Sequence, residues 1–494
     1  MQDIKIWEEK IKEKRKKTEF RDFVKEVASW KTIGLYKNNE IISKFPNTNK
    51  IYGVLSNNNF LDYRDNLKNF GINYNFDKDF FSNFQILLKQ TKLPGVFHFT
   101  QNENSDFSDE VGGVKNCYLA FSCVNNENVL YSGFVRNNCK NIFNSIFVVD
   151  NSENIYGASG IINSYNIFFS NYIVNSSDIY FCSDMIGCKE CLFCNGLENK
   201  SYFINNTSYS KDEYKNIKNK ILKDKKNYTF KSSDICLNKN YGSENVVGNF
   251  LINSSYVTNG YYSYCIENAR NIAFYGGLDN NKDIYDVVSG AGNSRNIYGC
   301  NSVGLSDNIF LSSNIIGNSI YYSYFLDGCS FCLGCIGLKN KSFCILNKQY
   351  SKEEWYELAN KIFFQMDKDG ILGDFFPGEL NPFYFNDTMA YLIDDSFTKE
   401  EVEKDGFMWR NEKIKVDIPE NAEIEKTKNL SSFQGFDSNG NWQINPEIMK
   451  KVIQDENGNV YKIVPMEYEF LMKHGLPLPE IHWLDRIKLG FKFK

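Results

Sequence analysis

A short unit recurs between Gly112 and Ile362, in which two polar residues precede two apolar residues. One copy is Lys115-Asn116-Cys117-Tyr118, and the second position of later copies returns at a near-constant step, at Asn128, Asn141, Asn154, Asn166, Asp178 and Glu190. A β-strand rises about 3.3 Å per residue, so this step holds one strand with its turn, or two very short strands. The pattern predicts a parallel β-solenoid with inward ladders of Ile, Val, Tyr, Phe and Cys. We favour two units per coil, about 25 residues, over one unit per coil.

The repeated asparagine indicates how the coils turn. Asparagine tolerates left-handed backbone conformations and hydrogen-bonds its own main chain. In stacked coils the asparagines lie above one another, and we expect their amides to bond along the solenoid.

The repeat is itself duplicated. GCKECLFCNGLENKSYF begins at Gly187 and GCSFCLGCIGLKNKSFC at Gly328, and we call the shift from Gly187 to Gly328 the duplication offset. Ser210 with Glu213, and Ser351 with Glu354, form capping boxes after the two copies. They predict helices over 211–223 and 352–365 that cover the last coil, whose open edge would otherwise pair with another chain.

The predicted fold is therefore mainly β: two tandem parallel β-helix lobes, each ending in a capping α-helix, between small α+β terminal domains. The expected boundaries are 1–108, 109–227 for lobe 1, 228–368 for lobe 2, and 369–494. Residues 1–27 read as one mixed-charge helix, and 411–444 as a polar loop or linker. Further helices are expected after Thr398, at Asn445-Pro446, and from Pro465 to Gly475.

Composition narrows the class of protein. Hydrophobic residues make up 42% of the chain, so it folds, and aromatic residues reach 16%. The net charge of -5 excludes a strongly basic nucleic-acid footprint overall. Arg486, Lys488, Lys492 and Lys494 read as a solubilising end. The N-terminus has no secretory pattern and no apolar run could span a membrane, so we expect a cytoplasmic protein with reduced cysteines.

Several long phrases resemble a known family. They are NGLENKSYFINNTSYSKDEY from Asn195, GCIGLKNKSFCILNKQYSKEEW from Gly334, DFFPGELNPFYFNDTMA, and EYEFLMKHGLPLPEIHWLDR. The chain resembles uncharacterised cysteine-rich repeat proteins of candidate-phylum bacteria, which are flanked by zinc-ribbon knuckles and have no established activity. The resemblance implies a doubled cysteine-rich repeat region between two knuckles.

The knuckle positions depart from the family pattern. A zinc ribbon needs two cysteine pairs. Neither the C-terminal segments 454–458 and 482–485 nor the N-terminal segments 32–36 and 52–55 contain a cysteine. We expect both knuckles to have lost metal and to keep their shape by packing.

The strongest candidate for metal chemistry is C-x-x-C-x-x-C, which occurs twice, as Cys188, Cys191, Cys194 and as Cys329, Cys332, Cys335. Thiols at this spacing could hold zinc or iron. However, the fourth ligands do not match between lobes, because Cys182 corresponds to Ser323, and Cys344 to Phe203. Free cysteine is also a small, readily buried hydrophobe. We therefore expect a structural ladder and no cofactor, with metal at these thiols as the alternative.

Catalytic groups are sparse. The three histidines, His98, His474 and His482, lie outside the repeats, so no Cys–His or Ser–His pair is indicated, and His482 reads as a surface residue. Asp279, Asp283 and Asp286 form a carboxylate cluster of the kind polysaccharide-cleaving β-helices need. However, Asp178, Asp283 and Asp307 occupy the turn position of the repeat, where aspartate replaces asparagine for backbone reasons.

The sequence favours a non-enzymatic binding or assembly protein, a scaffold for a macromolecule, for a protein partner or for a second copy in a homodimer. A nucleic-acid-associated protein is the first alternative, because abundant Tyr and Phe suit stacking on single strands. A carbohydrate-active enzyme is the second. No membrane association is expected.

Overall fold

The computed structural model describes residues 2–31, 41–42, 70–91, 93–94, 98, 100, 102–105, 107–223, 240–277, 281–411 and 423–490. The expected N-terminal knuckle, at 32–36 and 52–55, lies outside these residues. The chain forms two compact units, and each unit combines segments that are far apart in the sequence. The lobe 1 unit combines residues 98–236 with 411–492, and the lobe 2 unit combines residues 1–97 with 237–410.

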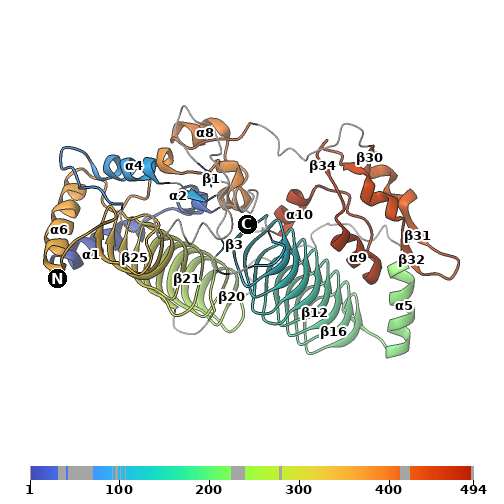
Figure 1. Cartoon of the computed structure of the whole chain (residues 1–494). Coiled ribbons are helices and arrows are strands. Elements are labelled where there is room, and N and C mark those ends of the chain that lie inside the picture. Colours follow the sequence, from blue (N-terminus) through green and yellow to red (C-terminus); the bar gives the residue numbers. More distant parts are fainter. Residues whose placement is uncertain are drawn as a thin grey trace. The chain divides into compact units, whose positions relative to one another are not determined.

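Lobe 1 is a parallel β-solenoid built from two sheets of short strands (Figure 1). One sheet contains β4 (Lys115–Tyr118), β6 (Glu127–Leu130), β8 (Lys140–Phe143), β10 (Glu153–Tyr156), β12 (Tyr165–Phe168), β14 (Ser177–Tyr180), β16 (Lys189–Leu192) and β18 (Ser201–Ile204). The other contains β3 (Ser108–Gly112), β5 (Ala120–Val124), β7 (Gly133–Arg136), β9 (Ile146–Val149), β11 (Ser159–Ile162), β13 (Asn171–Val174), β15 (Ser183–Ile186) and β17 (Asn195–Glu198).

The register of these strands fixes the length of a coil. Lys115 pairs with Glu127, and Glu127 pairs with Lys140, so the chain returns to the same sheet position after one repeat unit. Each coil contains two short strands, one for each sheet. The expectation of two units and about 25 residues per coil is therefore wrong. One unit closes one coil, because very short strands joined by single left-handed residues turn more tightly than longer strands do.

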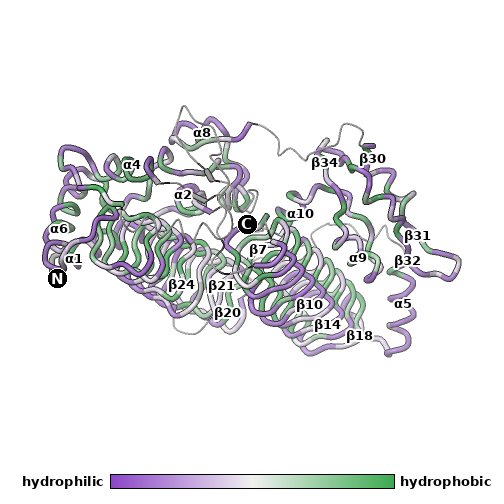
Figure 2. The backbone as a smooth tube through the Cα atoms, viewed as in Figure 1, coloured by the Kyte–Doolittle hydropathy of each residue, from purple (hydrophilic) through white to green (hydrophobic). Residues whose placement is uncertain are grey.

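Side chains point into lobe 1 at every third residue. Ile179, Cys182, Met185 and Cys188 are successive members of its buried core. The residue before an inward position is often left-handed, as at Asn116, where φ is 53°. The inward side chains thus follow a period of three, and hydrophilic and hydrophobic stretches recur from coil to coil (Figure 2).

The repeated asparagine occupies one of the left-handed corners and forms a ladder, as the sequence predicts. Asn116, Asn128, Asn141, Asn154 and Asn166 all have positive φ. Each Nδ2 donates to the Oδ1 of the next residue in the ladder, over 2.8–3.1 Å, and the last bond ends at Asp178.

Lobe 2 is also a parallel solenoid, in which neighbouring short strands are merged into longer ones. Its sheet contains β20 (Glu244–Ile252), β21 (Ser255–Tyr264), β22 (Ile266–Tyr275), β23 (Asn281–Ala291), β24 (Arg295–Gly304), β25 (Asp307–Phe310), β26 (Ser313–Tyr321), β27 (Tyr324–Leu333), β28 (Ser342–Ile345) and β29 (Lys348–Gln349). Glu267 pairs with Lys282, so this coil is longer than the others that the described pairings define.

Both lobes end in matched elements, related by the duplication offset. The short strand β19 (Thr207–Ser208) pairs antiparallel with β18, and β29 pairs in the same way with β28. Asn206 and Asn347 each bond both the N–H and the C=O of a residue in the last coil. Helices α5 (Lys211–Lys223) and α6 (Lys352–Lys368) follow, and both capping boxes are formed.

The rest of the lobe 2 unit consists of short helices and turns around a buried aromatic core. It contains α1 (Gln2–Arg15), α2 (Phe20–Glu26), η1 (Ala28–Trp30), β1 (Ile41–Ile42), α4 (Phe80–Gln90), β2 (Leu93–Pro94), η3 (Gly378–Leu380), η4 (Phe385–Asp387), α7 (Met389–Ile393) and α8 (Lys399–Lys404). Residues 1–27 thus form two helices, not one. Thr398 caps α8 as the sequence predicts, because its side chain accepts a bond from the N–H of Glu401.

The rest of the lobe 1 unit contains β30 (Ile424–Lys426), η5 (Thr427–Phe433), β31 (Gln434–Phe436), β32 (Trp442–Ile444), η6 (Pro446–Lys450), β33 (Val452–Gln454), β34 (Val460–Tyr461), α9 (Pro465–His474) and α10 (Trp483–Gly490). The expected long loop is wrong for residues 424–444, which form strands and a 3-10 helix. The helix at Pro446 is a short 3-10 helix, and α9 ends at left-handed Gly475 as predicted. No helix in the described ranges is both long and apolar enough to cross a bilayer.

Candidate functional site

The triple-cysteine motifs lie inside the solenoids, and their spacing is the inward period. Cys188, Cys191 and Cys194 are consecutive inward residues of lobe 1, each at most 2% exposed. Cys329, Cys332 and Cys335 occupy the matching positions of lobe 2 and are equally buried. A C-x-x-C-x-x-C spacing therefore arises whenever three successive inward positions contain cysteine.

Inward serine and cysteine residues also carry hydrogen bonds between coils. Ser170 Oγ donates to the Phe168 carbonyl at 2.8 Å and accepts the N–H of Cys182 at 3.0 Å. Cys182 does the same one coil later: its Sγ donates to the Tyr180 carbonyl and accepts the N–H of Cys194. A small side chain with a polar atom is needed here, because it satisfies a backbone N–H that the short strands leave unpaired.

Burial raises the pKa of Cys117, Cys139 and Cys300 to about 12, and it also raises the pKa of Cys182 and Cys335. These thiols are neutral, and a neutral thiol is a poor nucleophile and a poor metal ligand. Within the motifs, contacts with neighbouring thiols lower the pKa of Cys188 to about 7 and also lower the pKa of Cys194, Cys329 and Cys344.

Several thiols contact one another at Cys332. Its side chain interacts with those of Cys329, Cys335 and Cys344, and these contacts, with burial, raise its pKa. Cys344, the fourth-ligand candidate in lobe 2, thus lies beside the motif, and Cys182 contacts Cys194 in lobe 1. In the portion of the chain that the structure describes, no group of three or more His, Cys, Asp or Glu side chains is arranged to hold a metal ion.

The carboxylate candidates separate into different environments. Asp279 lies outside the described residues. Asp283 occupies the asparagine corner of its coil, with φ of 60°, and accepts a hydrogen bond from Asn268. Asp286 is completely buried at the next corner, where it accepts bonds from Arg15 Nε and Asn271 Nδ2, both at 2.8 Å. Burial raises the pKa of Asp286, and Arg15 opposes this shift.

Arg15 joins the N-terminal helices to lobe 2, a role the sequence does not reveal. Besides Asp286, its guanidinium contacts Glu26 at 2.9 Å, and its side chain is 4% exposed. Helix α1 lies along a stacked ladder of rings, which we call the lobe 2 aromatic wall, formed by Tyr285, Tyr298, Phe310 and Tyr321. Asp286 is therefore part of a buried structural ion pair beneath α1.

A second buried arginine fixes the C-terminal helices to lobe 1. Arg486 of α10 pairs with Glu467 of α9, and both side chains are fully buried. Its guanidinium also lies 5.0 Å from the ring centroid of Tyr131. The interpretation of Arg486–Lys494 as a solvated basic end is thus wrong for Arg486, while Lys492 and Lys494 lie outside the described residues.

Helix α9 covers the equivalent ring ladder, the lobe 1 aromatic wall, formed by Phe143, Tyr156, Phe168 and Tyr180. Phe470 stacks on Phe143 with a centroid distance of 4.3 Å, and the ring of His474 lies 5.4 Å from that of Phe168. Burial lowers the pKa of His474 to about 4. This histidine is therefore a neutral ring packed on other rings.

The remaining histidines also have local roles. His98 Nε2 lies 3.0 Å from the Ser108 carbonyl. His482 is partly buried, contrary to the surface position expected, and burial lowers its pKa to about 4. Its backbone N–H donates to Asp455, which brings together the segments 454–458 and 482–485 of the expected C-terminal knuckle.

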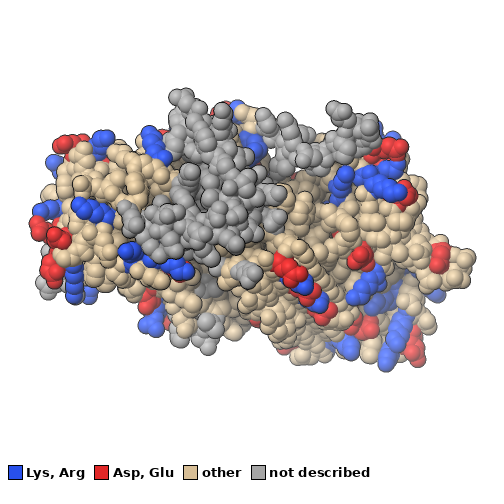
Figure 3. All heavy atoms as spheres, in the orientation of Figure 1, with Lys and Arg blue, Asp and Glu red and all other residues tan. Residues whose placement is uncertain are grey.

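The open faces of lobe 1 carry regular polar ladders. Lys115 pairs with Glu103 at 3.2 Å and Lys140 with Glu127 at 3.0 Å, all four largely exposed. The register places Glu153 after Lys140, which produces a stripe of alternating charge (Figure 3). These charges neutralise one another along the ladder.

Comparisons with known proteins leave the function open, since no family model, no curated protein and no solved structure matches the chain.

Proposed function

We propose that the protein is a non-enzymatic binding or assembly scaffold. The observation that carries the proposal is that each candidate reactive group among the described residues contributes to the internal structure of the protein. Cysteines bridge coils, Asp286 is buried against Arg15, and His474 is stacked on Phe168. Side chains fill the interior of each lobe, while regular ladders form its outer faces, and repeat surfaces of this kind typically bind partners.

The main competing function is cleavage of a polysaccharide by the carboxylates of lobe 2. Hydrolysis needs an acid and a second carboxylate on one accessible face. Asp286 is inaccessible beneath α1, and Asp283 bonds to Asn268. The geometry of these two residues favours a structural role for both.

Incubation with a panel of polysaccharides tests the proposal, with released reducing ends as the readout. We expect no release above that of a heat-denatured control. Release of sugar products that disappears in Asp283→Asn, while the variant keeps the melting temperature of the parent, would overturn the proposal.

Self-association is one form that assembly could take. Static light scattering across a concentration series measures it. A mass above that of the 57.3 kDa chain would identify the protein as its own partner, and a monomer would direct the search to other macromolecules.

A further inference from the structure

Helices α5 and α6 are two copies of one element that differ in charge. They are related by the duplication offset and follow matched hairpins. Helix α5 contains five lysines and two acidic residues, whereas α6 contains three lysines and four acidic residues. The two helices have different neighbours, because α6 also packs against α1, where Asp367 pairs with Lys10 at 2.5 Å. Packing therefore accounts for Asp367, and the positions without such a contact carry the comparison.

The difference is clearest at one pair of equivalent positions. In α6, Lys361 forms an ion pair with Glu357 at 2.6 Å. The equivalent lysine of α5 is Lys220, and the position equivalent to Glu357 holds Asn216. Helix α5 thus keeps the basic residue and lacks its neutralising neighbour.

The lysines of α5 lie mainly on the side turned away from the lobe. Tyr214, Ile217 and Ile221 pack against Leu192 and Ile204 of the last coils. Lys211, Lys215, Lys220 and Lys223 are exposed, and no ion pair involving them occurs among the described residues.

Lys218 differs from the other lysines of α5, because it forms an ion pair within the described part of the chain. It points toward the lobe, pairs with Glu190 at 3.0 Å and lies 4.5 Å above the ring of Tyr180. The side of α5 that packs on the lobe is therefore anchored by apolar contacts and one ion pair. The exposed surface of the helix presents four lysines together with Asp212 and Glu213, and these lysines pair with none of the described acidic residues.

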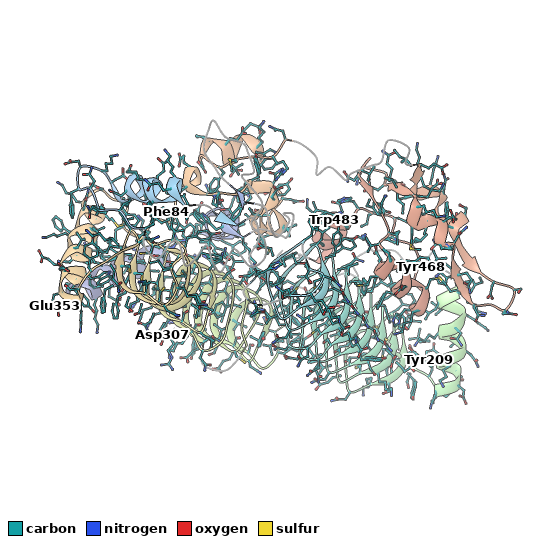
Figure 4. The ribbon with its side chains drawn as sticks, in the orientation of Figure 1. Phe84, Tyr209, Asp307, Glu353, Tyr468 and Trp483 are labelled. Atoms are coloured by element: carbon teal, nitrogen blue, oxygen red, sulfur yellow. The ribbon has the colours of Figure 1, made fainter. Side chains whose placement is uncertain are left out.

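The surroundings extend the basic character. Lys189 and Lys200, in the last coils next to the helix, are exposed as well. Tyr202 and Tyr209 are half-buried beside the first turn of α5, and Tyr209 lies at the base of the helix (Figure 4). Aromatic rings next to lysines are the combination that binds single-stranded nucleic acid, because bases stack on rings while lysines contact phosphates.

We propose that the exposed face of α5 (Lys211, Lys215, Lys220 and Lys223) binds the phosphate backbone of a single-stranded nucleic acid. The inference rests on the proposed binding function and names its partner class. From Lys211 to Lys223 the helix rises about 18 Å, enough to contact several consecutive phosphates. The net charge of -5 does not prevent this, because charges beyond about 8–10 Å are screened at physiological salt.

Fluorescence anisotropy with a labelled oligouridine of about 20 nucleotides tests the proposal. Counterion release predicts that log Kobs falls with log salt with a slope of about −0.7 for each phosphate contacted, so three or four lysines give about −2 to −3. The titration is run between about 50 and 200 mM salt, where this slope changes the affinity strongly.

The duplication supplies a matched pair of variants. Lys211→Gln/Lys220→Gln in α5 is compared with Lys352→Gln/Lys361→Gln at the equivalent positions of α6. We expect the α5 variant to weaken binding about tenfold or more and to reduce the slope by about 1.4, and the α6 variant to change little. All four lysines lie on helix surfaces, so melting temperatures should stay within a few degrees of the parent.

Three outcomes would overturn the proposal: no binding of oligouridine or oligothymidine at low salt, equal losses in the two variants, or tighter binding of a duplex than of a single strand. The first outcome leaves the scaffold proposal standing, because light scattering and the hydrolysis assay test it independently.

Discussion

At the scale of single residues, the inward positions explain both the cysteines and the serines. Every third residue points inside. Where two short strands meet, the inward side chain must be small and must accept a hydrogen bond from a backbone N–H of the neighbouring coil. Ser323 of lobe 2 bonds to the Tyr321 carbonyl and accepts the N–H of Cys335. Cys182, its equivalent in lobe 1, makes the same two contacts.

Cys182→Ser should therefore cost less than about 1 kcal/mol, since the hydroxyl reproduces both hydrogen bonds. Ser170→Ala should cost about 1–3 kcal/mol, because it leaves the buried N–H of Cys182 without a partner. Chemical denaturation monitored by circular dichroism gives both values. A larger loss for Cys182→Ser than for Ser170→Ala would mean that the thiol has a role that serine cannot fill.

The central β-branched residues should dominate the stability of a lobe. Ile309→Ala should destabilise lobe 2 by about 2–5 kcal/mol, the range for a buried aliphatic side chain, because Ile309 is completely buried between Ile297 and Ile320. Arg295→Ala should change the free energy of unfolding by less than about 0.5 kcal/mol, since Arg295 is exposed. Similar losses for the two variants would contradict the assignment of inside and outside.

The sequence contained enough information to predict these residue roles. The asparagine corner and its ladder follow from the repeat itself. The coil length does not follow from the repeat. The period of the repeat fits either one or two units per coil, and only the strand register distinguishes these two possibilities. The inward period of three was present in C-x-x-C-x-x-C, but that spacing is equally typical of metal ligands.

At the scale of elements, the two aromatic walls are covered by helices from opposite ends of the chain. Helix α1 covers the lobe 2 aromatic wall and α9 the lobe 1 aromatic wall. A buried arginine, Arg15 or Arg486, fixes each arrangement. The sequence predicted helix in both places, from the mixed charge of residues 1–27 and from Pro465 and Gly475 at the ends of α9. It did not predict their partners, because neither α1 nor α9 carries a repeat-like pattern that marks the wall it covers.

Arg486→Met should destabilise the lobe 1 unit by about 3–5 kcal/mol, because it leaves the buried Glu467 carboxylate unpaired. The double variant Arg486→Met/Glu467→Gln should recover part of that loss. Urea denaturation of the full chain provides the measurement. A double variant less stable than Arg486→Met would show that the two residues do not act as a pair.

His474 should make the lobe 1 unit less stable in mild acid. In the unfolded chain the pKa of histidine is near 6.5, whereas burial keeps folded His474 neutral until about pH 4. The unfolded state therefore binds more protons between these values, and stability falls as the pH drops through them. His474→Phe should make the melting temperature less dependent on pH over this window, and an unchanged dependence would argue against a buried neutral histidine.

At the scale of the whole molecule, the duplication is the organising feature. Both lobes share their hairpin, their capping asparagine and their helix at the duplication offset. The sequence predicted this doubling from its longest matching phrases. It did not predict that lobe 1 forms a compact unit with residues 411–492, or that the lobe 2 unit includes residues 1–97, because nothing in the repeat specifies such contacts.

The central claim is that the cysteine-rich interiors are held by packing and by hydrogen bonds between coils. Elemental analysis of protein purified without chelator, combined with thermal unfolding in the presence and absence of a strong chelator, tests this most directly. We predict substoichiometric zinc and iron, and a melting temperature that the chelator leaves unchanged. Stoichiometric metal that is lost, together with stability, in Cys191→Ser or Cys332→Ser would contradict the account.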